Sequence, residues 1–240
     1  MQAMDIAKLS YRDVARTIDH ALLRPELTPA EAAAGVALGR RYDVAAVCVR
    51  PCDVALARDE LAGSSTEICT VVGFPHGSST TATKVAESEQ AIAEGAGELD
   101  VVLNVGWLRA GLVDAVRDEL AEVVRAARQA HAIVKVILET AYLDDDQKRA
   151  GCLAAEAAGA HFVKTSTGYP ATATVEDVRI LREAASPALQ VEAAGGIRTL
   201  DALLALASAG ASRFGTSATV AILDDLTSRL RAVEEQAATI

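Results

Sequence analysis

Short apolar runs rich in β-branched residues alternate with longer amphipathic stretches along most of the chain. Each run predicts a buried strand, and each intervening stretch rich in Ala, Leu, Glu and Arg predicts a helix. The pattern repeats at intervals of roughly 25–30 residues, the size of one strand–helix unit, which favours parallel strands joined by helical crossovers. The clearest runs are 44–49, 68–74, 99–105, 133–139, 161–165 and 189–193, and the clearest helical stretches are 80–94, 112–130 and 144–158.

Two weaker runs, 17–22 and 212–216, complete the pattern near the two ends of the chain. Eight strand–helix units in 240 residues match the size of a (β/α)8 barrel, or TIM barrel. A doubly wound open sheet is the alternative, but it usually carries a G-x-G-x-x-G motif after its first strand, and this chain has none. We therefore predict one α/β barrel domain over residues 1–240, with a short N-terminal helix before the first strand.

The composition suits a large aliphatic core and excludes some functions. Hydrophobic residues make up 51% of the chain but aromatic residues only 3%, so Ala, Val, Leu and Ile must form the core. The net charge of −10 argues against a nucleic-acid partner, which needs a basic surface to meet phosphates. No apolar run reaches the roughly 18 residues of a membrane span. We therefore expect neither nucleic acid nor membrane as a partner, and a cytoplasmic location.

Lys164 is the sharpest candidate for chemistry, because the active sites of such barrels lie at the carboxyl ends of the strands. It stands in HFVKTSTGY, within a predicted strand and followed at once by hydroxyl residues and a glycine. A buried lysine is rare unless it is paired, and burial alone lowers its pKa and yields the free amine that attacks carbonyl groups. The alternative is a structural ion pair between Lys164 and a carboxylate of the barrel.

Asp100, Lys135 and Glu192 also fall within predicted strands. If consecutive strands are neighbours, Lys164 is flanked by the positive Lys135 on one side and the negative Glu192 on the other. A carboxylate inside a barrel needs a cationic partner or a proton, so Asp100 fits both a salt bridge to a lysine and a role in proton transfer. Lys135 has the alternative of pointing outward, which strand alternation alone does not decide.

Glycine-bearing loops after the last two predicted strands point to a bound phosphate. The segments AGGIRT (194–199) and FGTS (214–217) lie where barrels often hold phosphate with backbone N–H groups and a helix N-terminus. Arg198 and Ser217 would add side-chain donors. The four histidines are scattered without the spacing of a metal site, so the sequence predicts no metal.

With these residues in view, the chain resembles the deoxyribose-phosphate aldolase family. The likeness extends over nearly the whole chain, and FVKTSTGY (162–169) is its most specific motif. The other segments that carry it are IDHALLRP (18–25), VAAVCVRP (44–51), VVGFPHG (71–77), GAGELDVVLNVG (95–106), KVILET (135–140), AGGIRT (194–199) and RFGTS (213–217).

The resemblance implies a class I aldolase on a (β/α)8 barrel, without metal or organic cofactor and possibly dimeric as its relatives suggest. The implied reaction is the reversible cleavage of 2-deoxy-D-ribose 5-phosphate into D-glyceraldehyde 3-phosphate and acetaldehyde, a step of deoxyribose phosphate catabolism. Lys164 matches the lysine that forms the Schiff base, and Asp100 the carboxylate that transfers protons with an ordered water. The other matching positions line the substrate site or its phosphate-binding loops: Asp19, Cys48, Lys135, Thr167, Gly168, Gly195, Gly196, Arg198, Gly215 and Ser217.

One departure from the family pattern is serious, because Glu192 replaces the lysine that precedes AGGIR in the family. In the family that second lysine keeps the nucleophile neutral by like-charge repulsion, whereas a carboxylate favours the ammonium form of Lys164. Two alternatives to an active deoxyribose-phosphate aldolase therefore stay open. One is a related Schiff-base lyase that takes another aldehyde or sugar phosphate. The other is a catalytically impaired barrel that binds sugar phosphates without turning them over.

Overall fold

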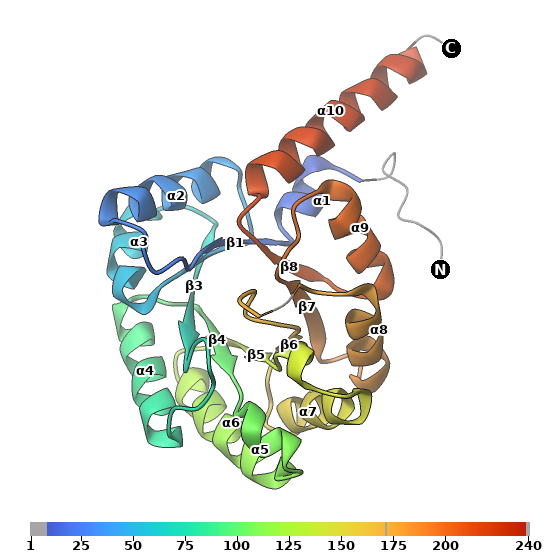
Figure 1. The fold of residues 1–240 in the computed structure, drawn as a ribbon. Helices are drawn as coiled ribbons and strands as arrows, with labels where there is room; N and C mark the ends of the chain where they lie inside the picture. Colours follow the sequence, from blue (N-terminus) through green and yellow to red (C-terminus); the bar gives the residue numbers. More distant parts are fainter. Residues whose placement is uncertain (1–8, 171, 239–240) are drawn as a thin grey trace.

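Eight parallel strands form a closed barrel, and the helices surround it as an outer layer (Figure 1). The computed structural model describes residues 9–170 and 172–238. Each strand pairs with the next along the chain, and β8 pairs with β1 to close the ring. The predicted TIM barrel is therefore confirmed, including its two weaker strands. The strands are β1 (Ile18–Leu22), β2 (Ala46–Val49), β3 (Glu67–Val72), β4 (Glu98–Val102), β5 (Ile133–Ile137), β6 (Phe162–Lys164), β7 (Gln190–Ala194) and β8 (Arg213–Thr216).

Helices follow the strands in the order that the sequence pattern predicts. A short helix, α1 (Tyr11–Ala15), precedes β1. The outer layer consists of α2 (Pro29–Arg41), α3 (Val54–Glu60), α4 (Thr81–Glu94), α6 (Val113–Arg128), α7 (Asp145–Ala157), α8 (Val175–Ala184), α9 (Leu200–Ala209) and α10 (Thr219–Ala238). Three short elements, α5 (Val105–Arg109) and the 3-10 turns η2 (Pro51–Asp53) and η3 (Thr140–Tyr142), lie in the loops that leave β4, β2 and β5. No helix among the described residues is long and apolar enough to cross a membrane.

Local signals in the sequence set where several helices begin and end. Thr28 caps α2 and exchanges hydrogen bonds with Glu31, and Asp144 does the same with Gln147 at the start of α7. Such reciprocal capping satisfies backbone N–H groups that have no partner inside the helix. Gly95 ends α4 with a φ of 121°, a conformation that glycine adopts at little cost.

Three strands are shorter at their carboxyl ends than the apolar runs that predict them. β3, β4 and β5 end at Val72, Val102 and Ile137. These positions are two or three residues before the ends of the apolar runs 68–74, 99–105 and 133–139. Leu103 and Leu138 continue the apolar runs because they are fully buried beneath the loops, although the strands end before them. Hydrophobicity reports burial, and it does not report where a strand ends.

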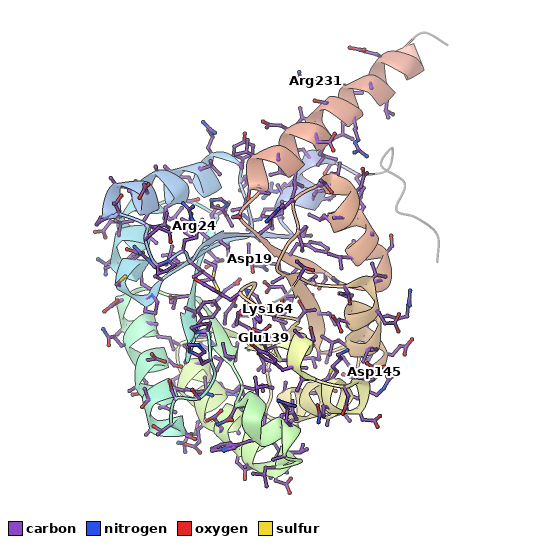
Figure 2. The ribbon with its side chains drawn as sticks, in the orientation of Figure 1. Asp19, Arg24, Glu139, Asp145, Lys164 and Arg231 are labelled. Carbon is purple, nitrogen blue, oxygen red and sulfur yellow. The ribbon has the colours of Figure 1, made fainter. Side chains whose placement is uncertain are left out.

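The core has two different compartments. The aliphatic core lies between sheet and helices, where alternate strand residues such as Val134 and Val136 are completely buried. The intervening residues face the barrel interior, where charged side chains extend from Glu98 and Arg213, which open β4 and β8, to Lys164 at the end of β6. Figure 2 shows Asp19, Lys164 and Glu139 inside the ring of helices, whereas Asp145 and Arg231 lie at its periphery. The fold thus places the candidate site where the sequence predicts it.

Candidate active site

A cavity of about 400 Å³ opens at the carboxyl end of the barrel, with Lys164 at its base. Ten of the predicted site residues line it: Asp19, Cys48, Lys164, Thr167, Gly168, Gly195, Gly196, Arg198, Gly215 and Ser217. Lys135, Asp100 and Glu192 do not line the cavity, because they are completely buried in the barrel interior. The structure therefore brings all the predicted positions together in two layers, an accessible cavity and a charged network inside the barrel.

Lys164 occupies the last position of β6 and is only 5% exposed. Its Nζ forms ion pairs with Asp100 and with Glu192, whose Oε1 lies 2.8 Å away. Burial lowers the pKa of Lys164, but the attraction of the two carboxylates outweighs burial and raises this pKa well above its ordinary value. Burial alone would give a neutral amine, but both carboxylates favour the ammonium form, as the sequence predicts for Glu192.

Lys135 points into the barrel, so the outward alternative is wrong. Its Nζ lies 2.5 Å from Asp19 Oδ2 and 2.8 Å from Glu98 Oε2. It is also 3.3 Å from both Asp100 Oδ1 and Glu192 Oε2. Although burial opposes the charged form, these carboxylates raise the pKa of Lys135 well above its ordinary value. Lys135 is thus a fixed cation within the network, close to the same carboxylates that hold Lys164.

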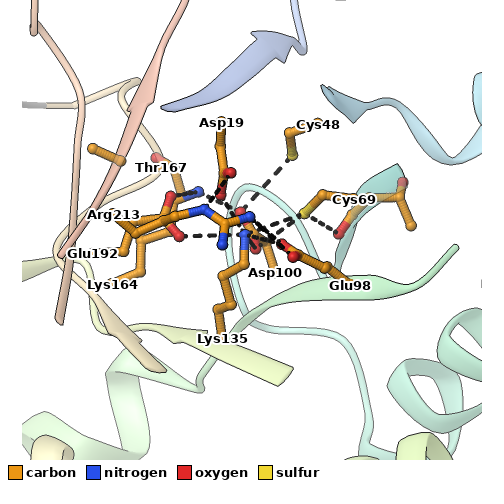
Figure 3. A network of polar contacts seen from close by, with 12 residues as sticks. Asp19, Cys48, Cys69, Glu98, Asp100, Lys135, Lys164, Thr167, Glu192 and Arg213 are labelled. Carbon is orange, nitrogen blue, oxygen red and sulfur yellow. Dashed lines mark hydrogen bonds and ion pairs between the residues drawn. The ribbon is translucent and has the colours of Figure 1, made fainter. Parts of the chain in front are cut away.

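Three further members of the network were not predicted from the sequence. Arg213 donates from Nε to Asp19 Oδ1 at 2.7 Å and from Nη2 to Glu98 Oε1 at 2.9 Å. Cys69 donates from Sγ to Asp100 Oδ1 at 3.2 Å (Figure 3). The available signal was alternation, since Glu98 shares the inward face of its strand with Asp100, two residues later. The same reasoning places Arg213 on the face of Gly215.

The network holds more carboxylates than cations. Its cations are Lys135, Lys164 and Arg213, and its carboxylates are Asp19, Glu98, Asp100 and Glu192. Burial raises the pKa of Glu192 to about 7, against the attraction of the two lysines. Neither oxygen of Glu192 accepts a hydrogen bond from the described part of the chain, although both lie within ion-pair distance of a lysine. For Asp100 the lysines outweigh burial and lower the pKa, so Glu192 takes up a proton more readily than Asp100 does.

The loops after β7 and β8 present donors to the cavity. Gly195 and Gly196 have φ values of 97° and 71°, and a Cβ at Gly196 would lie 2.3 Å from Thr172 Cγ2. Only glycine fits this turn without displacing its neighbour. Arg198 is exposed, and among the residues that the structure describes none forms an ion pair with it. Ser217 lies just before α10, so an anion there meets a helix N-terminus as well.

Gly215 lies deeper than the loops to which the resemblance assigns it. It is within β8, and a Cβ built on it would lie 3.1 Å from Glu192 Oε1 and 3.5 Å from Lys164 Nζ. This Cβ would also lie 2.9 Å from Ala194 Cβ, so the missing side chain lets β8 approach the amine closely. Gly215 lines the cavity as expected, but beside the reactive nitrogen.

Cys48, Cys69 and Asp100 have potential metal-ligand atoms within 4.8 Å of one another. Asp100 is already paired with two lysines, whose charge opposes a second cation. Burial raises the pKa of the Cys69 thiol well above its ordinary value, whereas a metal ligand must be a thiolate. These groups are therefore poorly suited to a metal ion.

Comparisons with known proteins agree with this geometry. Residues 1–223 match the family model described as DeoC/LacD family aldolase. A deoxyribose-phosphate aldolase from Caldanaerobacter subterraneus is 44% identical over 218 residues, covering 90% of this chain and 94% of that protein. Deoxyribose-phosphate aldolase 1 from Bacillus licheniformis is 45% identical over 217 residues, covering 90% of this chain and 97% of that protein.

Solved structures of similar proteins have the same fold. A putative deoxyribose-phosphate aldolase from Coccidioides immitis superposes with a TM-score of 0.87 at 35% identity, covering 94% of this chain and 88% of that one. A deoxyribose phosphate aldolase from Aeropyrum pernix, described as having a unique tetrameric structure, gives 0.85 at 33% identity, covering 95% and 99%. The fold and the lysine-based cavity define a barrel enzyme of the class I aldolase type. The chain belongs to the DeoC/LacD aldolase family.

Proposed function

We propose that the chain cleaves 2-deoxy-D-ribose 5-phosphate reversibly into D-glyceraldehyde 3-phosphate and acetaldehyde, with Lys164 as the nucleophile. The observation that carries the proposal is the position of Lys164 Nζ, which stands at the base of an open cavity beside the buried carboxylate of Asp100. An amine that reaches a bound carbonyl can form an imine, which then withdraws electrons from the bond to be broken. The names of the similar proteins support the choice of substrate.

The reaction follows from this arrangement. Neutral Lys164 attacks the aldehyde carbon C1 of the open-chain sugar, and loss of water leaves an iminium ion. A proton passes from the C3 hydroxyl to Asp100 through a water molecule while the C2–C3 bond breaks and its electron pair moves toward the iminium nitrogen. D-Glyceraldehyde 3-phosphate leaves, C2 of the enamine takes up a proton, and hydrolysis releases acetaldehyde and restores the amine.

The phosphate of the substrate is assigned to the loops after β7 and β8. Gly195 and Gly196 present backbone to the cavity, and Arg198 supplies a guanidinium without a carboxylate partner among the described residues. We expect Arg198→Met to raise KM for the phosphorylated sugar, with little change for unphosphorylated 2-deoxyribose. Equal losses with both substrates would contradict this assignment, because a phosphate contact cannot act on a substrate that lacks phosphate.

A sugar-phosphate-binding barrel without turnover is the second candidate. The observation that favours it is the pairing of Lys164 with two carboxylates, Asp100 and Glu192, which hold its amine protonated. A third candidate, a Schiff-base lyase for another aldehyde, shares the imine with the proposed aldolase and differs only in its preferred substrate. Both enzymes therefore attach a carbonyl compound to Lys164, whereas the sugar-phosphate-binding barrel does not.

A coupled cleavage assay combined with borohydride trapping separates these functions. With 2-deoxy-D-ribose 5-phosphate we expect the production of glyceraldehyde 3-phosphate and, after reduction, a covalent adduct on the peptide that contains Lys164. Trapping of acetaldehyde without cleavage of this sugar would favour the other lyase. Absence of any adduct on Lys164 between pH 7 and pH 9.5 would favour the binder.

The expected homodimer is tested by measuring the mass of the unmodified protein in solution.

A further inference from the structure

A second cavity, of about 490 Å³, lies beside the candidate active site. Thr167 and Tyr169 line both cavities, so the loop after β6 forms the wall between them. Glu139, which follows β5, lines only the second of these two cavities, and Figure 2 shows it inside the ring of helices. The proposed aldolase reaction uses neither Glu139 nor this space.

Glu139 is a buried carboxylate that has no cationic partner among the residues that the structure describes. It is 2% exposed, and its backbone is left-handed, with φ 57° and ψ 63°. Its Oε2 accepts hydrogen bonds from the backbone N–H of Thr167 at 3.2 Å and from Thr167 Oγ1 at 2.5 Å. Its Oε1 has no hydrogen-bond partner, and within residues 9–170 and 172–238 no lysine, arginine or histidine pairs with it. Buried carboxylates are normally paired, and left-handed backbone at a non-glycine residue is costly.

Arg109 brings the opposite charge to the same cavity. It is the last residue of α5, and its guanidinium forms no ion pair or hydrogen bond with any described residue. The rings of Tyr142 and Tyr169 also line the space and are both about half exposed. One cavity therefore combines an unpaired carboxylate, an unpaired guanidinium and aromatic faces, which attract cations.

We propose that this cavity binds a small molecule that carries both an ammonium group and an anionic group. The ammonium group supplies the countercharge to the Glu139 carboxylate, whose enclosed Oε1 turns toward the cavity to accept its hydrogen bond. The anionic group binds Arg109, and the carbon chain between them packs against Tyr142 and Tyr169. A cavity of this size falls within the range of roughly 300–1,000 Å³ that small-molecule sites occupy. The proposal does not depend on the aldolase reaction, because Lys164 takes no part in it.

Calorimetric titration with matched probes tests the requirement for two charges. The probes are glycine, 3-aminopropanoate, 4-aminobutanoate and 6-aminohexanoate, which place the same two groups at increasing separation. Butanoate and butylamine each retain one of the charges of 4-aminobutanoate. We expect the best-fitting amino acid to bind with a Kd on the order of 1 mM, at least about tenfold more tightly than either singly charged compound. Equal binding of butanoate, or no binding of any amino acid at 50 mM, would overturn the proposal.

Variants locate the binding. Arg109→Met should abolish the advantage of the amino acid over butylamine, and Glu139→Gln should abolish its advantage over butanoate. Arg117→Met is the matched control, because Arg117 is a partly exposed arginine of α6 that pairs with Asp114 and Asp118 and does not line the cavity. The Arg117→Met variant should bind the amino acid as tightly as the parent chain does. If Arg109→Met binds every probe as the parent does, the cavity is not the binding site. This conclusion does not require Glu139→Gln to fold.

Discussion

Two of the buried lysines that contact carboxylates, Lys84 and Lys164, have different surroundings. Lys84 lies between helices α4 and α6, where its Nζ is 2.6 Å from Glu119 Oε1 and both side chains are fully buried. Lys164 lies inside the barrel with two carboxylates and an opening to the cavity. Burial lowers the pKa of Lys84 despite Glu119, whereas the pKa of Lys164 is raised because its two carboxylates outweigh burial.

The difference teaches that neither burial nor a lowered pKa identifies a reactive lysine. By pKa alone Lys84 is the better nucleophile, but it lies beneath Gly73, where an added Cβ would already come within 2.9 Å of its Cε. No carbonyl compound can reach it there. Lys164 is less ready to lose a proton but borders an open space. Access therefore separates the structural pair from the candidate catalytic group, and the charge network sets how reactive that group is.

Replacement of Lys164 should give the largest effect. Lys164→Arg keeps a positive charge but cannot form an imine, because guanidinium does not deprotonate in proteins. We expect turnover of the deoxysugar phosphate to fall by at least about a thousandfold, the usual scale for losing a nucleophile. Lys148→Arg, on α7, is the control and should keep full turnover. Retention of activity by the Lys164 variant would mean that another amine carries the chemistry.

Asp100→Asn tests whether the carboxylate next to Lys164 does more than pair with it. The change preserves the shape of the side chain but removes the proton acceptor, so turnover should fall by roughly 10²–10⁴-fold. Borohydride trapping on Lys164 should fall much less. If trapping and turnover decreased equally, Asp100 would act on imine formation, and its contact with Lys164 would resemble the structural pair of Lys84.

The Lys84–Glu119 pair should matter for stability and not for chemistry. Lys84→Met leaves the buried Glu119 without its cationic partner, so the free energy of unfolding should fall by about 3–5 kcal/mol in chemical denaturation. Lys84→Met combined with Glu119→Leu removes both charges and should recover most of this loss. The double variant should form the borohydride adduct like the parent. A large loss of trapping by the folded double variant would break the distinction between the two lysines.

Replacement of Glu192 should have the smallest effect on the rate, and its effect on the pH dependence is the most informative. Because the pKa of Lys164 is raised, the fraction of free amine, and with it the rate, should increase as pH rises from 7 to 9. Glu192→Lys should restore like-charge repulsion and move the rising limb toward neutral pH by about one unit or more. Glu192→Gln should fall between the two. Identical profiles for all three would show that Glu192 does not control the amine, although each profile reports the coupled network as a whole.

Much of this architecture could be predicted because it depends on local patterns. Alternating runs gave the eight strands, and the motif around Lys164 gave the site. The sequence did not reveal that Lys84 is as deeply buried as Lys164, because a lysine in an amphipathic helix normally faces solvent. Glu98 and Arg213 were missed for a similar reason, since each opens a strand and looks like a strand-end charge. Their role depends on how eight separate strands are aligned in the barrel, and no single segment encodes that alignment.

Gly215 lets β8 pack closely against the residues around the amine. An added Cβ there would lie 2.9 Å from Ala194 Cβ and 3.1 Å from Glu192 Oε1, as well as 3.5 Å from Lys164 Nζ. A methyl group at position 215 would therefore have to displace Ala194 or the carboxylate of Glu192. Because Glu192 Oε1 lies 2.8 Å from Lys164 Nζ, a displaced carboxylate would change the charge beside the amine. Replacement of one hydrogen atom on β8 would thus act on the ionisation of a lysine on β6.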